Sequence, residues 1–550
     1  MTAYEGEAGS VSRLCRRCSL WVLAGWLAAG GGLVPTLAAA RQLAPSTVSA
    51  APVPARSGHR KKPPPVPPPP PPVCADGQPA LSPAEVSSLA LAAAGAVASP
   101  PSPPMTVAVV DRAGKLLGLY RQAGASTAND DLAIGLARTG AFFSNDQAPL
   151  SSRTVRFISG IHFPPGIANT PNAALYGIEN TNRGCDLDIT FLPGKAVPPA
   201  VSLAGGLCKG AAHTAGCGTG PVTGKVDLFD SNPAAVDPGG VPLFRGTAVV
   251  GGIGVAGVPP PAAEFAAVAA AATGFLPTVA PPGVVFIDGI RLPFVEQTTR
   301  PAGTGPGTPA GTFAAPGPQT GGCAPEGYLA GPAAGSQLSA AEVDQIVQQA
   351  IAGASLTRAQ IRLPLGSRTR MVIAVSDLDG TILALYRMPD ATVFSIDVAV
   401  AKSRNVVYFS GGSAQAQQDL PGVPPGTAVT NRTIGFGAQP LYPPGIDGAG
   451  PGPFFGLLQA DAANPCTQGS QTANPQHQSG IVFFPGSLPL YHGSSLAGGL
   501  GVSGDGVEQD DYVTFLGAQG FLPPTGIWAD NVFIEGVRLP FLKFPRNPEQ

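Results

Sequence analysis

Charged side chains are scarce in this chain of 550 residues: only 12% are Asp, Glu, Lys or Arg, about half of the ~25% that is usual in soluble domains. Neither sign dominates, because 32 basic and 34 acidic residues leave a formal net charge of −2. Without a basic surplus there is no overall field to hold nucleic acid, so we expect none as a partner. Histidine is also rare, with five residues, which argues against an enzyme built on histidine chemistry.

Glycine and proline are abundant instead, with 73 and 63 residues, which places the chain at the edge of the low-complexity range. Hydrophobic residues nevertheless make up 44% of the sequence. That content can build substantial cores, so we exclude disorder over the full length. The length allows three or four domains, or fewer large ones.

The first forty residues have the pattern of a secretory signal. Three arginines precede an uncharged apolar run over residues 20–40, which ends in small residues. We therefore predict a signal peptide over residues 1–40 and a periplasmic or extracellular location, with no membrane span left after cleavage. The alternative is a retained anchor, but the glycines and Pro35 in the run favour cleavage. The pair Arg16 and Arg17 leaves the twin-arginine route open beside general secretion.

Residues 41–73 cannot form a core, because residues 63–72 are nearly all proline. Such a run adopts a stiff polyproline II conformation, and we interpret residues 41–73 as a proline-rich linker. The linker would hold the rest of the chain away from a membrane or wall, or bind a groove that recognises proline-rich peptides.

The remaining chain contains a tandem duplication. An apolar strand, an Asp-x-x-Gly turn and a second strand occur twice, as does the following apolar segment with helical spacing. Later matches are a Pro-Pro-Gly-Ile motif, a glycine-rich strand and a Phe-Ile-acid-Gly-x-Arg-Leu-Pro-Phe segment. The matched pairs are residues 106–121 and 372–387, 131–144 and 397–410, 163–167 and 442–446, 249–257 and 496–504, and 285–294 and 532–541.

Each copy has the order helix, hairpin, helix, long irregular insert, hairpin, helix and terminal strand. Ser82 and Ser339 each stand three residues before a glutamate, which predicts capping boxes at the first helices. Hairpins with helices between them indicate an α+β fold around an antiparallel sheet. We place the first copy at residues 74–298, a flexible Gly/Pro linker at 299–322 and the second copy at 323–550.

The second copy resembles the GlcG/HbpS-like haem-binding family. The resemblance rests on the Ala-Val-x-Asp-x-x-Gly hairpin around Asp377, the Ile-Asp-x-Ala-x-Ala-Lys-x-Arg helix with Asp397, Lys402 and Arg404, and the Gly-Val-Ser-Gly run that leads to Asp511. It implies two profilin-like α/β/α domains, each an antiparallel five-stranded sheet with flanking helices. It also implies haem as the cofactor and oligomers formed through the sheet domains.

The first copy departs from this pattern after its glycine-rich strand. It reads Val-Pro-Pro-Pro-Ala-Ala-Glu264 where the second copy has an acidic helix start. Three prolines predict a helix without a normal N-cap that begins only around Ala262. We therefore expect a shared ligand to bind mainly to residues 323–550, with the first copy as a scaffold.

The acidic cluster of the second copy is Asp505, Glu508, Asp510 and Asp511. It could polarise a ligand or hold a cation, but helix capping with Asp505 as the N-cap is favoured. The glycine runs resemble a dinucleotide fingerprint, yet no βαβ unit follows them. We interpret these glycines as sites of close backbone packing.

Haem requires an axial ligand, usually His, Cys, Met or Tyr. His492, in a Tyr-His-Gly turn, is the best single candidate, although an exposed turn histidine is the simpler interpretation. Tyr386 could supply an oxygen ligand and Arg387 a propionate partner, unless both only end a strand. The candidate ligand-binding residues are therefore Tyr386, Arg387, Asp397, Arg404, His492, Glu508, Asp510 and Asp511.

Six cysteines remain once the predicted signal is removed, and an even number in an exported chain indicates disulfides. Equivalent positions in the two copies favour one of the possible pairings, namely Cys74–Cys185, Cys323–Cys466 and Cys208–Cys217. The spacing of Cys208, His213 and Cys217 would also suit a metal clip, but three ligands in a glycine-rich, oxidising context favour the disulfide. We predict no metal site.

These features predict an exported, non-catalytic protein that binds haem or another small planar or carboxylate ligand. No Ser-His-Asp order, zinc motif or paired catalytic carboxylate occurs in both copies, so we expect no enzyme activity. The alternative is a structural or protein-interaction module at the cell surface or in the periplasm, without a small-molecule cargo.

Overall fold

The computed structural model describes residues 80–178, 181, 238–277, 285–464, 467–474 and 476–550. The predicted signal peptide, the proline-rich linker and every predicted half-cystine except Cys323 lie outside these residues. Cys323 lies within them, and its pairing with Cys466 stays a prediction. Within the described residues, no helix is both long and apolar enough to cross a membrane. Both copies lie in one compact unit, residues 67–550.

The described residues of the first copy, called copy one below, form two hairpins of its main sheet, a small terminal hairpin, three longer helices and the short helix α3. Its elements are α1 (Pro83–Ala96), β1 (Thr106–Asp111), β2 (Leu116–Gln122), η1 (Thr127–Asn129), α2 (Asp130–Phe143), α3 (Ser152–Phe157), β3 (Gly240–Arg245), β4 (Ala248–Ala256), α5 (Pro260–Ala271), β5 (Phe286–Ile287), β6 (Ile290–Arg291) and β7 (Gly311–Phe313).

In copy two the same order of helices and hairpins recurs after a first strand, and its insert contains the helices α8, α9 and α10. Its elements are β8 (Gly327–Ala330), α6 (Ala340–Leu356), β9 (Val372–Ser376), β10 (Ile382–Arg387), α7 (Ser395–Ser410), α8 (Ala414–Asp419), α9 (Asn431–Gly437), α10 (Phe455–Ala463), β11 (Ser487–His492), β12 (Ser495–Ser503), α11 (Val507–Gly517), η3 (Thr525–Ile527), η4 (Ala529–Asn531), β13 (Phe533–Ile534) and β14 (Val537–Arg538). The repeated order confirms the duplication.

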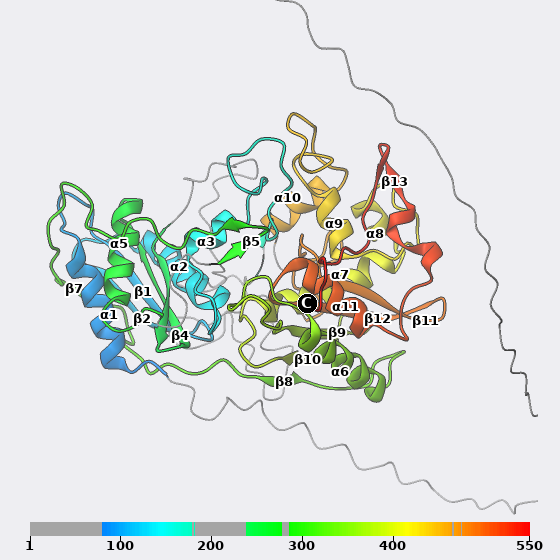
Figure 1. The fold of residues 1–550 in the computed structure, drawn as a ribbon, viewed down its shortest axis with the longest axis horizontal. Helices are drawn as coiled ribbons and strands as arrows, with labels where there is room; N and C mark the ends of the chain where they lie inside the picture. Colours follow the sequence, from blue (N-terminus) through cyan, green and yellow to red (C-terminus); the bar gives the residue numbers. More distant parts are fainter. Residues whose placement is uncertain (1–79, 179–180, 182–237, 278–284, 465–466, 475) are drawn as a thin grey trace, which may run out of the picture. The chain divides into compact units, whose positions relative to one another are not determined.

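Each copy is built on a five-stranded antiparallel sheet, in the order β3-β4-β1-β2-β7 in copy one and β11-β12-β9-β10-β8 in copy two. Alternate residues of a strand point to opposite faces. Val107 and Val109 of β1 pack in a cluster with α1 and α5, whereas Ala108 and Val110 pack with α2. Helices therefore cover both faces of the sheet (Figure 1), and the predicted α+β class is confirmed.

The glycine-rich strands allow the central helix of each copy to pack directly on the sheet. A Cβ atom at Gly254 of β4 would overlap the carbonyl oxygen of Ala133 in α2. Gly501 of β12 stands in the same relation to Ala399 of α7. The interpretation of these glycines as packing residues is confirmed.

The linker differs from the flexible joint that its composition predicted. Residues 311–313 form β7, which pairs with β2 as the fifth strand of copy one. Beyond this strand, the backbone N–H of Gln319 donates to Leu117 and that of Gly321 donates to Leu81. Copy one thus receives its fifth strand after its last helix, whereas copy two receives β8 before its first.

The two copies share one apolar core, in which the C-terminal end of α2 meets the N-terminal end of α7. The rings of Phe143 and Phe394 stack with centroids 4.2 Å apart. Next to them, the backbone N–H of Val393 donates to the carbonyl of Phe142. Equivalent helices therefore meet end to end, and we call this region the junction.

Two boundaries differ from the sequence predictions. Helix α5 begins at Pro260 and not near Ala262, because proline fits the first turn, and Pro259 occupies the N-cap without a side-chain hydrogen bond. The terminal strand is a small hairpin in each copy, with Asp288 and Glu535 at positive φ in the turns. Both predicted capping boxes, at Ser82 and Ser339, are confirmed.

Candidate functional site

A short helix in the middle of each copy fixes the segment that follows the terminal hairpin. Helices α3 and α9 both open with a capping box. The hydroxyl of Thr154 donates to the carbonyl of Pro293, and that of Thr433 donates to the carbonyl of Pro540. These bonds align the Arg-Leu-Pro-Phe segments, and each copy gains a surface between its short helix and its last segment.

An arginine on each short helix pairs with a buried acid on the last helix of its sheet domain. Arg153 Nε donates to Glu264 Oε1 over 2.7 Å. In copy two, Arg432 Nε donates to Asp511 Oδ2 over 2.5 Å. We call these the two latch pairs; Glu264 therefore takes the place of Asp511 in copy one. The sequence reasoning missed both arginines, although a repeated Arg-Thr-aliphatic-x-Phe motif marks them.

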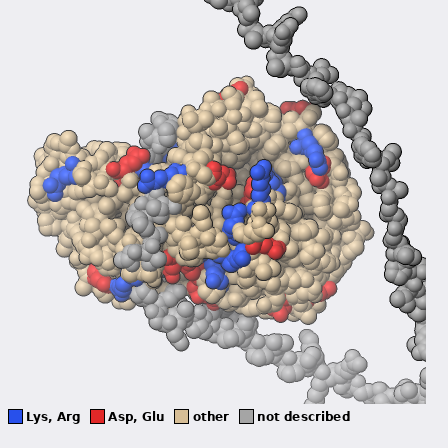
Figure 2. All heavy atoms as spheres, viewed as in Figure 1, with Lys and Arg blue, Asp and Glu red and all other residues tan. Residues whose placement is uncertain are grey.

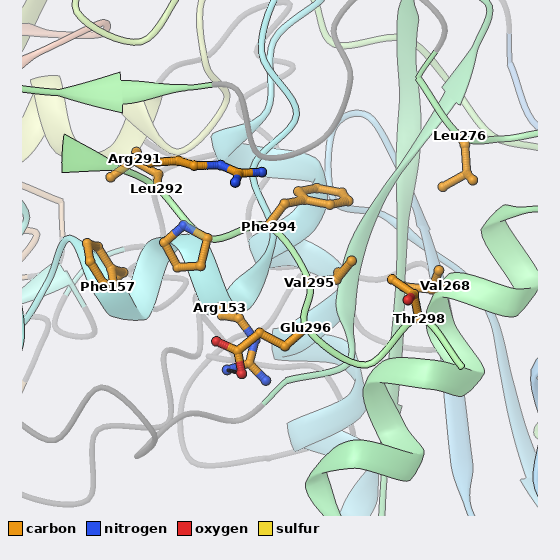
Figure 3. A pocket seen from close by; sticks show the side chains of 11 residues that line it. Arg153, Phe157, Val268, Leu276, Arg291, Leu292, Phe294, Val295, Glu296 and Thr298 are labelled. Carbon is orange, nitrogen blue, oxygen red and sulfur yellow. Dashed lines mark ion pairs between the residues drawn. The ribbon is translucent and has the colours of Figure 1, made fainter. Parts of the chain in front are cut away.

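Each latch pair borders a pocket at the same place in its copy. Figure 3 shows the pocket of copy one, of about 540 Å³, with Arg153 and Glu296 close together and Phe157 and Phe294 on the walls. Arg153 Nη1 lies 3.0 Å from Glu296 Oε2, so this guanidinium pairs with a second acid.

The corresponding pocket of copy two has about 410 Å³ and lies at the junction, because residues of both copies line it. We call it the junction pocket. Arg432, Phe436 and Pro540 stand where copy one has Arg153, Phe157 and Pro293. Lys543 replaces Glu296 and pairs instead with Glu508. Arg432 Nη2 has no hydrogen-bond partner among the described residues.

A narrow recess of about 30 Å³ adjoins the junction pocket and shares six of its lining residues, among them Gln360, Phe484 and Val507. Asp510 also lines the recess. Its Oδ1 atom is buried and has no hydrogen-bond partner in the part of the chain that the structure describes. The recess is otherwise lined mainly by apolar side chains.

Asp510 forms a buried ion pair with Lys402, whose Nζ lies 3.0 Å from Asp510 Oδ2. Burial raises the pKa of Asp510 to about 7, and burial lowers the pKa of Lys402. Copy one has Leu136 and Ala263 at these two positions and keeps no such pair.

Asp505 is not the N-cap of α11, as the capping interpretation held. Gly506 occupies that position with φ 140°. The buried Asp505 carboxylate instead accepts from Arg362, whose Nη1 also donates to Asp390 over 2.6 Å. The acidic helix start therefore belongs to a network of buried ion pairs, and the helix begins without a side-chain cap because a glycine precedes it.

Tyr386 is half-buried and Arg387 is buried, and both make contacts within copy two. The ring of Tyr386 packs edge-on against Tyr328, with centroids 5.0 Å apart. Arg387 is 1% exposed and donates to the carbonyls of Ala324, Pro325 and Ala391. This arrangement does not support the predicted role of Arg387 as a propionate partner, because backbone carbonyls already receive its N–H groups.

The other candidates lie apart from one another. His492 Nε2 lies 3.1 Å from Glu342 Oε1, at the start of α6. Arg404 is buried and donates to Gly380 and Gln476. Asp397 is buried within α7. Of the eight predicted residues, the structure brings Glu508 and Asp510 to the junction pocket and its recess.

Comparison with known proteins gives the following similarities. The family model described as "Haem degrading protein HbpS-like" matches twice, at residues 81–272 and 338–518. A crystal structure of a PduOC:heme complex is 22% identical over 34% of this chain and 95% of its own, with a TM-score of 0.22. The Klebsiella pneumoniae protein ORFY is 21% identical over 32% of this chain and 86% of its own, with a TM-score of 0.21. No curated protein matches the chain.

Proposed function

The chain belongs to the HbpS-like family, and on this premise we propose that it is an exported, non-catalytic haem-binding protein. The observation that carries the proposal is the junction pocket. Its volume of about 410 Å³ is within the ~300–1,000 Å³ of ligand sites. Phe163, Phe436 and Phe484 give it aromatic walls, and Arg432 and Lys543 stand among its polar groups.

Haem has two features that such a pocket can recognise, namely a flat apolar ring and two carboxylates. Aromatic side chains offer faces for the ring. An arginine and a lysine offer charge-assisted hydrogen bonds to carboxylates. Residues of both copies line the pocket. We therefore propose that both copies contact the ligand, whereas the sequence led us to expect binding mainly by copy two.

Export is supported by the N-terminal sequence, with its arginines and uncharged run. The same compartment would allow the predicted disulfides Cys74–Cys185, Cys323–Cys466 and Cys208–Cys217 to form. Fractionation of the native host, with the mature N-terminus read by mass spectrometry, tests this part. Oligomers formed through the sheet domains also stay a prediction.

Titration of the full chain with haemin tests the binding proposal. We expect a shift of the Soret band that saturates at one haem per chain. A titration without a saturable change would contradict the proposal.

The family description favours haem degradation as the second candidate function. The two are separated by exposing the haem complex to ascorbate in air and following the Soret band. With a non-catalytic protein, the Soret band should decay no faster than that of free haem. A haem-degrading protein should accelerate this decay and release iron.

A further inference from the structure

The walls of the junction pocket suit a flat apolar ligand. Phe163 reaches it from the insert of copy one, and Phe436 and Phe483 reach it from copy two. Ile158 and Ile287 of copy one add aliphatic contacts near the recess. A ligand in the pocket would therefore contact aromatic side chains supplied by separate parts of the chain.

Its polar groups suit an anionic end of the ligand. Arg432 is held by Asp511 through Nε, which leaves Nη2 without a partner among the described residues. Arg432 lines the pocket, where its guanidinium can offer charge-assisted hydrogen bonds to a bound carboxylate. Lys543 is 66% exposed and can turn from Glu508 toward a bound carboxylate. Copy one differs here, because Glu296 pairs with its arginine.

The described lining of the pocket holds no conventional ligand for iron. None of the described residues that line it is His, Cys, Met or Tyr, the residues that usually hold haem iron. The nearest histidine in sequence to its lining residues is His162, beside Phe163. Its Nδ1 lies 2.9 Å from the Thr170 carbonyl and its Nε2 lies 3.0 Å from Asp447 Oδ1, so both ring nitrogens are engaged. The residues fit the porphyrin ring and its carboxylates, but they do not fit the iron.

We propose that the junction pocket recognises the carboxylated ring of a tetrapyrrole and not its metal, so that the metal-free porphyrin binds as tightly as haem. This rests on the proposed function, because it takes the junction pocket as the ligand site. It goes further by naming the ligand class as planar tetrapyrroles with free carboxylates.

The test compares three probes on the full chain by isothermal titration: haemin, protoporphyrin IX and protoporphyrin IX dimethyl ester. We expect the affinities for haemin and protoporphyrin IX to agree within about threefold. We expect the ester to bind at least about tenfold more weakly, because it cannot accept the charge-assisted bonds.

The variant Lys543→Glu places the residue of copy one in the junction pocket. We expect it to weaken haemin and protoporphyrin IX equally, by about tenfold. Arg546→Glu is the matched control, because it reverses an exposed charge three residues further along. It should leave both affinities unchanged.

The outcomes separate the two claims. Tight binding of haemin with more than tenfold weaker binding of protoporphyrin IX would overturn the inference and leave the proposed function standing. Equal binding that Lys543→Glu does not change would overturn the inference as well, because the carboxylate site would lie elsewhere. Failure of both porphyrins to bind would overturn the proposed function itself.

Discussion

Lys402 and Asp510 form an ion pair inside copy two, with 3.0 Å between Nζ and Oδ2 and with both side chains at most 3% exposed. Copy one replaces both residues with apolar ones, Leu136 and Ala263. The same two positions are thus filled by an ion pair in copy two and by apolar side chains in copy one. Asp510 also lines the recess of the junction pocket. The buried ion pair therefore occurs in copy two, the copy whose side chains we propose bind the ligand carboxylates.

Exchange of this pair for the residues of copy one tests its energetic role. The single variant Lys402→Leu leaves a buried carboxylate unpaired and should destabilise the protein by about 3–5 kcal/mol. The double variant Lys402→Leu, Asp510→Ala should range from neutral to about 4 kcal/mol more stable. Urea unfolding followed by circular dichroism measures both. If the double variant were as unstable as Lys402→Leu, the apolar residues of copy one could not replace the ion pair in copy two.

The pH dependence of stability should carry the signature of Asp510. Burial raises its pKa to about 7, Lys402 from α7 opposes this, and Asp511 and Asp505 add to it; an unfolded aspartate titrates near ~3.9. The folded state therefore holds the proton of Asp510 more tightly than the unfolded state does. The contribution of this proton to the free energy of unfolding is complete below about pH 4 and is lost as pH rises through about 7. The double variant should be stabilised relative to wild type as pH rises across this window. Identical slopes for both proteins would refute this assignment.

The latch pairs should contribute similarly in the two copies. Glu264→Gln and Asp511→Asn each remove the carboxylate that receives the arginine, and each should cost about 1.5–3 kcal/mol. Their midpoints of urea unfolding measure this. The control is Arg538→Gln, whose exposed pair with Asp530 should be worth no more than about 1 kcal/mol. A loss confined to one copy would contradict the equivalence of the two latches.

Because β7 pairs with β2, we expect the linker of residues 299–322 to be held against copy one. The Phe313 ring packs edge-on against Tyr120 with centroids 5.1 Å apart, and such pairs contribute about 0.5–1.5 kcal/mol beyond burial. Phe313→Ala should therefore speed proteolytic cleavage within residues 299–322. Phe286→Ala, at a phenylalanine that is 45% exposed, is the control. Equal cleavage in wild type and Phe313→Ala would support a free linker.

Local patterns explain why the fold was predictable. Apolar periodicity, capping boxes and the repeated Asp-x-x-Gly hairpins are written in neighbouring residues, and Ser82 and Ser339 cap their helices as expected. The linker was not predictable in this way. Its Gly/Pro composition is typical of a free joint, and only pairing with β2 makes residues 311–313 a strand.

The candidate site was less predictable, because its residues meet only through the tertiary structure. Arg432, Phe163 and Lys543 come from distant segments and from both copies. Motif reasoning selected polar residues at strand ends, in the repeated helix motif and at the acidic helix start, and several of these, such as Arg387, have buried internal partners. A residue-by-residue comparison of the copies would have been the stronger signal, because the exchange of Glu296 for Lys543 marks the difference between the two pockets.

The anomalous scattering of iron gives the most direct test of the junction pocket as the ligand site. Crystals of the full chain grown with haemin should show one iron peak per chain, between the aromatic walls that include Phe163 and Phe436. The porphyrin carboxylates should face Arg432 and Lys543. An iron peak at His492, or at any place outside the junction pocket, would contradict the account.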